Sequence, residues 1–280
     1  MNRTDARAPI FPDLPAYLKR IGFRGLARPD LETLEALQRA HVGAVPFENL
    51  DVQLHRPVGL DLDYCFDKIV RQRRGGWCFE LNGVLGWALR EIGFDVMRMS
   101  AGVMRERLGD EQMGNHLCLL VRIDRPYLVD VGFGGSLALP LPLEAAVHDQ
   151  IPYRITLSDL GDGNWRFSEV AKSEPFSFDF CNTSADERRF ADKCAMLQRN
   201  PNSPFVQNLI VQRRCGDTHV SLLGRVLRTL RESGEDKAEL ASADELVAVL
   251  RDVFDMNVPE AAALWPAICA RHDTLFADAP

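Results

Sequence analysis

Two adjacent glycines that lead into an apolar helical pattern constrain this chain more than any other feature. They lie in residues 74–83, which read RGGWCFELNG, and the apolar positions after them repeat at helical spacing up to Gly93. Glycine permits a sharp entry into a helix and leaves neighbouring side chains accessible. The pattern therefore predicts a helix that begins near Trp77 and carries Cys78 in its first turn.

Two later segments add an imidazole and a carboxylate. His116 opens a predicted strand, and Asp130 lies at the end of the next one. Because sequential strands are usually neighbours, we expect these two side chains to lie together. A helix N-terminus and an imidazolium both favour a cysteine thiolate, a carboxylate orients the imidazole, and backbone amides near Cys78 face a developing oxyanion. The three residues therefore suit an activated cysteine nucleophile.

Each residue also has an ordinary structural role. A cysteine is most often a small buried residue, a histidine is often structural, and an aspartate at a strand end often belongs to a turn. The GFGG segment at 132–135 is usually a simple turn, and it lacks the Lys-Ser/Thr of a phosphate-binding loop. The residue types alone support a cysteine acyl-transfer enzyme and a bland globular fold equally.

Composition excludes several classes of protein. The 280 residues are 46% hydrophobic and 26% charged, as in an ordinary globular protein. The formal net charge of -7 argues against a nucleic-acid binder. We see neither a secretory signal nor an apolar run of about 20 residues, so no membrane association is expected. Cys215 and His219 lack a second ligand pair, so no metal is expected. Seven scattered cysteines indicate reduced thiols and a cytoplasmic location.

The first part of the chain reads as helical and the middle as strands. Asp30 and Asp61 are predicted N-caps, Gly75 is predicted to end the second of these helices, and Gly93 the helix of Cys78. Short apolar segments then predict antiparallel strands of a barrel or sandwich at 95–104, 116–123, 126–131, 152–158 and 165–171.

The last part of the chain mixes both patterns. We expect helices at 184–197, from Ser242 to Phe254 and from Pro259 to Cys269, strands at 205–213 and 218–223, a loop at 200–204 and a mobile surface loop at 231–240.

The chain resembles the arylamine N-acetyltransferases. The matching pieces keep their order and spacing: VPFENL at 45–50, residues 74–82, the His116 strand and VDVGFG at 129–134, with weaker similarity at 200–205 and 224–227. The resemblance implies an α+β fold in three parts. These are an N-terminal helical bundle with the nucleophile (1–93), a central antiparallel β-barrel with the histidine and aspartate (94–198), and a C-terminal α/β lid (199–280).

The resemblance also implies a mechanism. Cys78 is the nucleophile of a cysteine-protease-like triad, His116 its base and acid, and Asp130 its orienting residue. Cys78 takes an acetyl group from acetyl-CoA, CoA leaves, and the nitrogen of an arylamine, arylhydrazine or N-arylhydroxylamine attacks the thioester. Acetyl-CoA is thus a substrate, no cofactor is permanently bound, and the protein is a monomer or homodimer.

Further positions match residues with known places in the family. Phe133 shapes the acceptor pocket, and Gly134 and Gly135 allow the backbone to approach CoA. Glu48 and Arg74 form an ion pair that supports the cysteine loop. For the CoA phosphates, Arg213 and Arg214 are a candidate patch, although such pairs are more commonly solvated basic turns.

Three alternatives share parts of this pattern. An amide synthase that releases ansamycin polyketides has the same fold but takes a carrier-bound acyl chain. A papain-like or transglutaminase-like hydrolase uses the same triad chemistry. A non-catalytic binding protein could keep the fold, although an intact Cys78, His116 and Asp130 argues against it.

Overall fold

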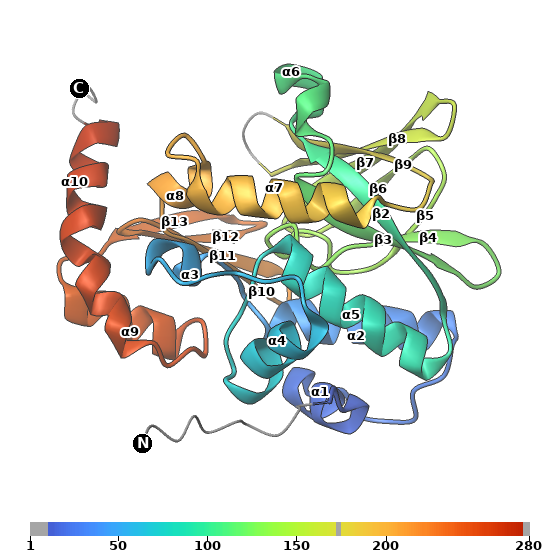
Figure 1. Cartoon of the computed structure of the whole chain (residues 1–280), viewed down its shortest axis with the longest axis horizontal. Helices are drawn as coiled ribbons and strands as arrows, with labels where there is room; N and C mark the ends of the chain where they lie inside the picture. The colour runs from blue at the N-terminus through green and yellow to red at the C-terminus, as the bar shows by residue number, and fades with distance from the viewer. Residues whose placement is uncertain (1–10, 172–174, 277–280) are drawn as a thin grey trace, which may run out of the picture.

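A computed structural model describes residues 11–171 and 175–276 (Figure 1). The expected lack of a secretory signal concerns mainly residues 1–10, which lie outside the described residues. No helix in the described part is both long and apolar enough to cross a membrane. The described elements form a helical N-terminal part, a large central sheet and a second sheet flanked by the C-terminal helices.

The N-terminal part is helical, as predicted. Asp30 and Asp61 accept hydrogen bonds from backbone N–H groups at the starts of their helices, and Gly93 ends the helix of Cys78 with a φ of 107°. The elements are α1 (Leu14–Ile21), α2 (Leu31–Ala44), β1 (Phe47–Glu48), α3 (Leu50–Gln53), α4 (Leu62–Phe66), a π-helical turn η1 (Asp67–Arg71) and α5 (Cys78–Ile92).

The prediction that Gly75 ends the second helix is wrong. The π-helical turn ends at Arg71, and Arg73 adopts the left-handed conformation, with a φ of 55°. Gly75 is required for close packing instead, because a Cβ on it would lie 2.7 Å from Cγ of Glu48. The sequence showed where the glycine lies but not that a neighbouring strand passes beside it.

The central sheet is antiparallel, with strand order β5-β4-β3-β2-β9-β8-β7-β6. Its edge strands β5 and β6 do not pair with each other in the described residues, so the sheet stays open where a closed barrel was expected. The Gln150 side chain on β6 instead bonds the Ala138 N–H and the Leu139 carbonyl. The strands are β2 (Asp95–Val103), β3 (His116–Arg122), β4 (Pro126–Val129), β5 (Leu141–Pro142), β6 (Ala146–Gln150), β7 (Tyr153–Gly161), β8 (Asn164–Val170) and β9 (Phe176–Cys181).

Strand β3 lies at the centre of the molecule and is buried on both faces. Leu117 and Leu119 pack with the helical part, whereas Cys118 and Leu120 pack with the opposite face of the sheet. A strand covered on both faces reads as a continuous apolar run. The two apolar environments fix the register of β3 and so the position of His116 at its start.

The second sheet has the order β1-β10-β11-β12-β13. The predicted mobile loop at 231–240 is wrong, because most of it forms strand β13; that edge strand is polar and mostly exposed, so it lacks an apolar signal. The predicted strand at 205–213 begins instead with a short helix. The elements are α7 (Glu187–Arg199), α8 (Pro204–Gln207), β10 (Ile210–Cys215), β11 (Thr218–Leu223), β12 (Val226–Arg231), β13 (Gly234–Glu239), α9 (Ala243–Asp252), a 3-10 turn η3 (Pro259–Leu264) and α10 (Trp265–Phe276).

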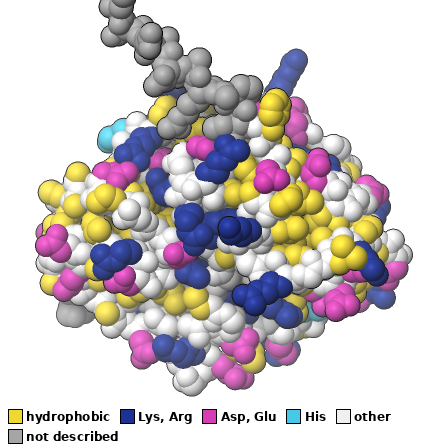
Figure 2. Space-filling view, turned by 90° about the horizontal axis from the view of Figure 1, so that it is seen from below, with side chains coloured by type: hydrophobic (Ala, Val, Ile, Leu, Met, Phe, Trp, Pro, Cys, Tyr) yellow, Lys and Arg dark blue, Asp and Glu magenta, His cyan; other side chains and the backbone are white. Residues whose placement is uncertain are grey.

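The exterior is mixed in charge. On the face shown in Figure 2, several Lys and Arg side chains gather near the middle, with Asp and Glu side chains around them. The interspersed charges agree with the modest acidic balance of the whole chain. On this face the basic side chains therefore do not form the continuous stripe that nucleic-acid binding requires.

One buried amide joins the N-terminal part to the C-terminal sheet. Asn49 Nδ2 donates to the carbonyls of Phe205 and Asn208 at 2.8 Å each, and its Oδ1 accepts the Ile210 N–H at 2.8 Å. Asn49 is 2% exposed, so these groups depend on one another for hydrogen bonds.

We expect Asn49→Ala to lower the free energy of unfolding by about 2 kcal/mol, because it leaves buried backbone groups without partners. Urea denaturation measures the change. Asn202→Ala is the matched control, since Asn202 is exposed. Equal stabilities for the two variants would contradict the role of Asn49.

Candidate active site

Cys78 is the first residue of α5 and follows the N-cap residue Trp77. Its side chain lines a cavity of about 400 Å³, although the residue is only 5% exposed. The N–H groups of Glu80 and Leu81 bond to the Trp77 carbonyl. Within the described residues, the N–H groups of Cys78 and Phe79 have no acceptor, so they are available to an anion at the helix start.

His116 and Asp130 lie together, as expected from their adjacent strands. The ring Nε2 lies 2.6 Å from Oδ2 of Asp130, and both residues are at least 98% buried. The Cys78 and His116 side chains line the same cavity, and the Cys78 thiol donates to the Asn115 carbonyl, with its sulfur 3.8 Å from that oxygen. Since Nε2 contacts Asp130, Nδ1 is the ring nitrogen available to the sulfur. The structure therefore brings together all three residues that the sequence singled out.

The second oxygen of Asp130 is held by groups that the sequence analysis gave no role. Asn82 Nδ2 and the Gly132 N–H donate to Oδ1, both at 2.7 Å. Asn82 also accepts the Val131 N–H at 3.0 Å. The sequence did contain a signal for the role of Asn82, because this residue lies four positions after Cys78 and therefore on the same face of α5.

Residue 132 must be a glycine because of close packing, and not because it lies in a turn. A Cβ there would lie 2.5 Å from the Cys78 Cα, which is closer than atoms can approach. The segment after Asp130 therefore packs directly against the start of α5. This contact sets the position of the carboxylate relative to the thiol.

The environment of His116 favours its charged form. Burial lowers the pKa of the ring, but the charge and hydrogen bond of Asp130, together with Cys78, outweigh burial and raise the pKa to about 10. The imidazole therefore carries a proton at neutral pH. The positive charge therefore lies on a ring that lines the same cavity as the Cys78 side chain.

The cavity beside Cys78 has an aromatic wall. The Phe133 ring lies 5.4 Å from the His116 ring and stacks on Phe176 at 4.9 Å, with 14° between the planes. Gly134, at a φ of 72°, also lines the cavity, whereas the contacts of Gly135 are with Arg214. An apolar wall of this kind suits a flat aryl group.

A polar group that sequence reasoning missed lines the far side of the cavity. His219 Nε2 lies 2.7 Å from the Gly134 carbonyl, and its Nδ1 lies 2.8 Å from the Tyr153 hydroxyl. Since a carbonyl only accepts, Nε2 carries the proton and Tyr153 donates to Nδ1. Burial lowers the pKa of His219 to about 4, so this ring is neutral and both its nitrogens are occupied.

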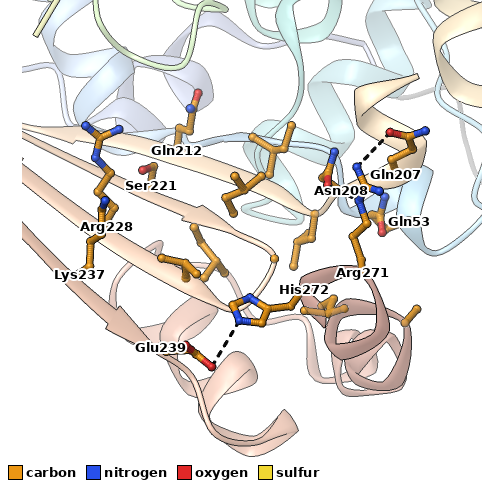
Figure 3. A pocket seen from close by; sticks show the side chains of 18 of the residues that line it. Gln53, Gln207, Asn208, Gln212, Ser221, Arg228, Lys237, Glu239, Arg271 and His272 are labelled. Atoms are coloured by element: carbon orange, nitrogen blue, oxygen red, sulfur yellow. Dashed lines mark hydrogen bonds and ion pairs between the residues drawn. The ribbon is translucent and has the colours of Figure 1, made fainter. Parts of the chain in front are cut away.

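A groove of about 860 Å³ runs over the C-terminal sheet and shares Ile210 and Gln212 with the first cavity. Figure 3 shows Arg228 and Lys237 on the strands at one side and Arg271, on α10, at the other. Arg271 donates to the neutral side chains of Asn208 (3.0 Å) and Gln207 (3.2 Å). Arg228 and Lys237 both pair with Glu235, at 2.6 and 3.2 Å, so of these three cations Arg271 is the one held by neutral partners.

Arg213 and Arg214 do not form the phosphate patch or the solvated turn considered above. Arg214 is 3% exposed and donates to the Ser136 carbonyl at 2.6 Å and the Gln150 carbonyl at 2.9 Å. Arg213 donates to the Gly43 carbonyl at 2.7 Å. Both guanidinium groups are used to join elements of the fold.

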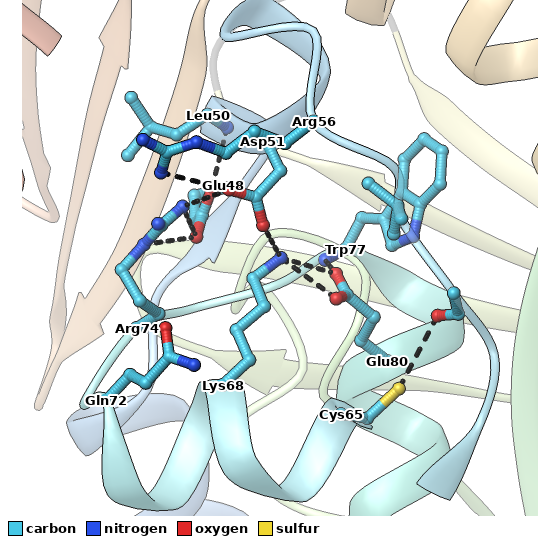
Figure 4. A network of polar contacts seen from close by, with 12 residues as sticks. Glu48, Leu50, Asp51, Arg56, Cys65, Lys68, Gln72, Arg74, Trp77 and Glu80 are labelled. Atoms are coloured by element: carbon cyan, nitrogen blue, oxygen red, sulfur yellow. Dashed lines mark hydrogen bonds and ion pairs between the residues drawn. The ribbon is translucent and has the colours of Figure 1, made fainter. Parts of the chain in front are cut away.

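The expected ion pair between Glu48 and Arg74 is present, at 2.8 Å. It belongs to a larger buried network, in which Arg74 also contacts Asp51 at 3.2 Å, and Lys68 contacts Asp51 at 2.8 Å and Glu80 at 2.9 Å (Figure 4). The network lies under the segment that leads into α5. No local sequence pattern singled out Lys68, Asp51 or Glu80 as members of this network.

Comparisons with known proteins agree on one family. A family model described as N-acetyltransferase matches residues 30–263. An arylamine N-acetyltransferase from Mycolicibacterium smegmatis is 36% identical over 260 residues, which cover 89% of this chain and 94% of the relative. This chain belongs to the arylamine N-acetyltransferase family. The human family member arylamine N-acetyltransferase 1 is 30% identical over 277 residues, covering 88% of this chain and 94% of that protein.

Solved structures of the family have the same fold. The arylamine N-acetyltransferase of Mycobacterium marinum superposes with a TM-score of 0.84 at 32% identity, covering 91% of this chain and 98% of that chain. The same protein in complex with CoA gives a TM-score of 0.83 at 32% identity, covering 94% and 99%.

The raised pKa of His116 makes a pH prediction. Because the folded pKa of about 10 exceeds the ordinary value of 6.5, the stabilisation from this pair is fully present below pH 6.5 and is lost as pH rises through 10. In Asp130→Asn only burial and Cys78 remain, so the pKa should fall far below 10. NMR titration of labelled histidines measures the pKa of His116 in the wild-type protein and in Asp130→Asn. The His116→Gln variant identifies the His116 signal. A wild-type ring that loses its proton near pH 6.5 would contradict the coupling.

Proposed function

We propose that this protein is an arylamine N-acetyltransferase that transfers acetyl groups from acetyl-CoA through a thioester on Cys78. The observation that carries the proposal is that Cys78 and His116 line one aromatic cavity while the His116 ring lies 2.6 Å from Asp130. The CoA complex of a structural neighbour supports CoA as the donor. Free cysteines throughout the described residues support the cytoplasmic location.

In the first half-reaction, the Cys78 sulfur attacks the acetyl carbonyl. The carbonyl oxygen becomes negative, and the unpartnered N–H groups of Cys78 and Phe79 lie at the positive end of α5, where they stabilise that charge. The C–S bond to CoA breaks, and His116 donates its Nδ1 proton to the leaving CoA sulfur. The enzyme then holds an acetyl thioester on Cys78 and a neutral imidazole.

In the second half-reaction, the nitrogen of an arylamine, arylhydrazine or N-arylhydroxylamine attacks that thioester. A C–N bond forms, the C–S bond to Cys78 breaks, and the proton released by the nitrogen passes to His116 Nδ1. Asp130 stabilises the resulting imidazolium, and the initial state is restored. The ring of Phe133 would pack against the aryl group of the acceptor.

The nucleotide end of the donor fits the groove over the C-terminal sheet. That groove adjoins the cavity of Cys78 and carries Arg271, whose hydrogen-bond partners are neutral amides. A guanidinium that is not neutralised by a carboxylate is suited to a phosphate. We therefore place the CoA phosphates near Arg271 and the thioester arm toward Gln212.

We expect Cys78→Ala to abolish acetyl transfer while leaving the protein folded, because the change removes the nucleophile and only a small side chain. Intact-mass spectrometry after mixing with acetyl-CoA should show one acetyl adduct on the wild-type protein and none on the variant. Cys215→Ala, which changes an exposed cysteine, should keep the adduct. Turnover by purified Cys78→Ala would exclude the thioester, and donor hydrolysis unaffected by an arylamine would favour a hydrolase.

We expect Arg271→Ala to raise the KM for acetyl-CoA about tenfold, through loss of a charge-assisted hydrogen bond. The KM for S-acetylpantetheine, which lacks the nucleotide, should not change. Arg251→Ala is the control, because Arg251 is exposed and pairs with Asp252 on α9. Equal effects of Arg271→Ala on both donors would place the nucleotide elsewhere.

A further inference from the structure

The buried charge network under α5 contains one pair that touches the start of that helix. Lys68 Nζ lies 2.9 and 3.1 Å from the two oxygens of Glu80, and Oε2 of Glu80 accepts the Trp77 N–H at 3.1 Å. Figure 4 shows Glu80 between the ammonium group and Trp77. Trp77 is the N-cap residue directly before Cys78.

The usual way to fix a helix start is not available here. A Ser, Thr or Asp at the N-cap would accept an N–H of the first turn, but Trp77 has no such acceptor. A capping box has two reciprocal hydrogen bonds, and only one is present here: the Glu80 carboxylate accepts the Trp77 N–H. Among the described residues, no acceptor is bonded to the N–H groups of Cys78 and Phe79, and the Cys78 side chain lines the cavity. The helix start is therefore held by Glu80 and not by a side chain that accepts these N–H groups.

The local backbone is shaped to allow this contact. A Cβ on Gly76 would lie 2.8 Å from Oε2 of Glu80, so the carboxylate reaches Trp77 only because residue 76 is glycine. Lys68 belongs to the π-helical turn η1, a rare conformation that frequently occurs at functional sites. The turn places a cation where the side chain is only 4% exposed.

Lys68 also keeps Glu80 able to accept hydrogen bonds with both oxygens. Burial raises the pKa of Glu80, the charge and hydrogen bond of Lys68 oppose that rise, and the resulting pKa is about 7. Lys68 in turn has a second carboxylate partner, Asp51, at 2.8 Å. Without the ammonium group, the pKa of the buried carboxyl would rise further, and its contact with the Trp77 N–H would weaken.

We propose that Lys68 and Glu80 are positioning residues for catalysis, which set the start of α5 so that the Cys78 sulfur meets His116 and the first-turn N–H groups face the thioester. Neither residue touches a substrate. The proposal rests on the proposed role of Cys78 as nucleophile, and it goes beyond the Glu48–Arg74 pair, whose carboxylate holds the Leu50 N–H and not the helix start.

The test compares two proteins. One is the single variant Glu80→Ala, and the other is a double variant that carries both Lys68→Gln and Glu80→Gln and so replaces the charged pair by a neutral one. We expect Glu80→Ala to slow both thioester formation in a single turnover and alkylation of Cys78 by iodoacetamide by about tenfold or more, since small displacements of reacting groups have effects of this size. The double-glutamine protein retains a carbonyl for the Trp77 N–H and a hydrogen bond within the pair. It should recover to within about threefold of wild type.

Tyr17→Phe is the matched control. It removes a buried 2.8 Å hydrogen bond to His41 in the same helical part and does not touch residues 76–80. It should lower the thermal midpoint but leave both rates unchanged. If Glu80→Ala does not fold, Glu80→Asp replaces it, because aspartate keeps the charge but is too short to reach Trp77 and Lys68 together.

Two results would overturn the proposal. One is a folded Glu80 variant whose two rates equal those of Tyr17→Phe. The other is a double-glutamine protein no faster than the single variant, which would show that the hydrogen bond to the Trp77 N–H does not set the position of Cys78. The alkylation assay needs no acetyl-CoA, so a wild-type protein that forms no thioester would refute the proposed function and leave the positioning test intact.

Discussion

The active-site architecture depends on the burial of one carboxylate. Asp130 is 1% exposed, and an ionised carboxyl in such a place requires several donors. It has three: the His116 ring, the Asn82 amide and the Gly132 N–H. These come from a strand, a helix and the loop after the next strand. The helical part and the central sheet therefore have to meet in one arrangement for the charge to be satisfied, and that arrangement brings Cys78 beside His116.

Much of this arrangement could be predicted from the sequence, for identifiable reasons. The helix start at Cys78 follows from local patterns, as do the N-caps Asp30 and Asp61. The contact of His116 with Asp130 follows from the tendency of sequential strands to pair. These features depend on residues close together in the chain or on adjacent elements.

The features that sequence reasoning missed depend on distant parts of the chain. Strand β13 carries the sequence GEDKAE, which has no apolar face because the strand lies at an exposed edge. Arg214 looks like a surface cation, yet it is buried by carbonyls from segments more than 60 residues away. Gly75 looked like a helix terminus, but a glycine is required there because strand β1 packs closely against it. Neither local pattern nor composition contains information about such partners.

The short strand β1 has a consequence for how ligands enter and leave. Phe47 and Glu48 pair with Gln212 and Val211 of the C-terminal sheet, and on the other side Glu48 donates its N–H to the Gly76 carbonyl. The strand is thus hydrogen-bonded simultaneously to the second sheet and to the segment that leads into Cys78. Swinging the C-terminal sheet away would break these backbone bonds and displace the nucleophile. Two parts of the fold that backbone hydrogen bonds join therefore bound the cavity of Cys78, and the side chains that line it limit what reaches the sulfur.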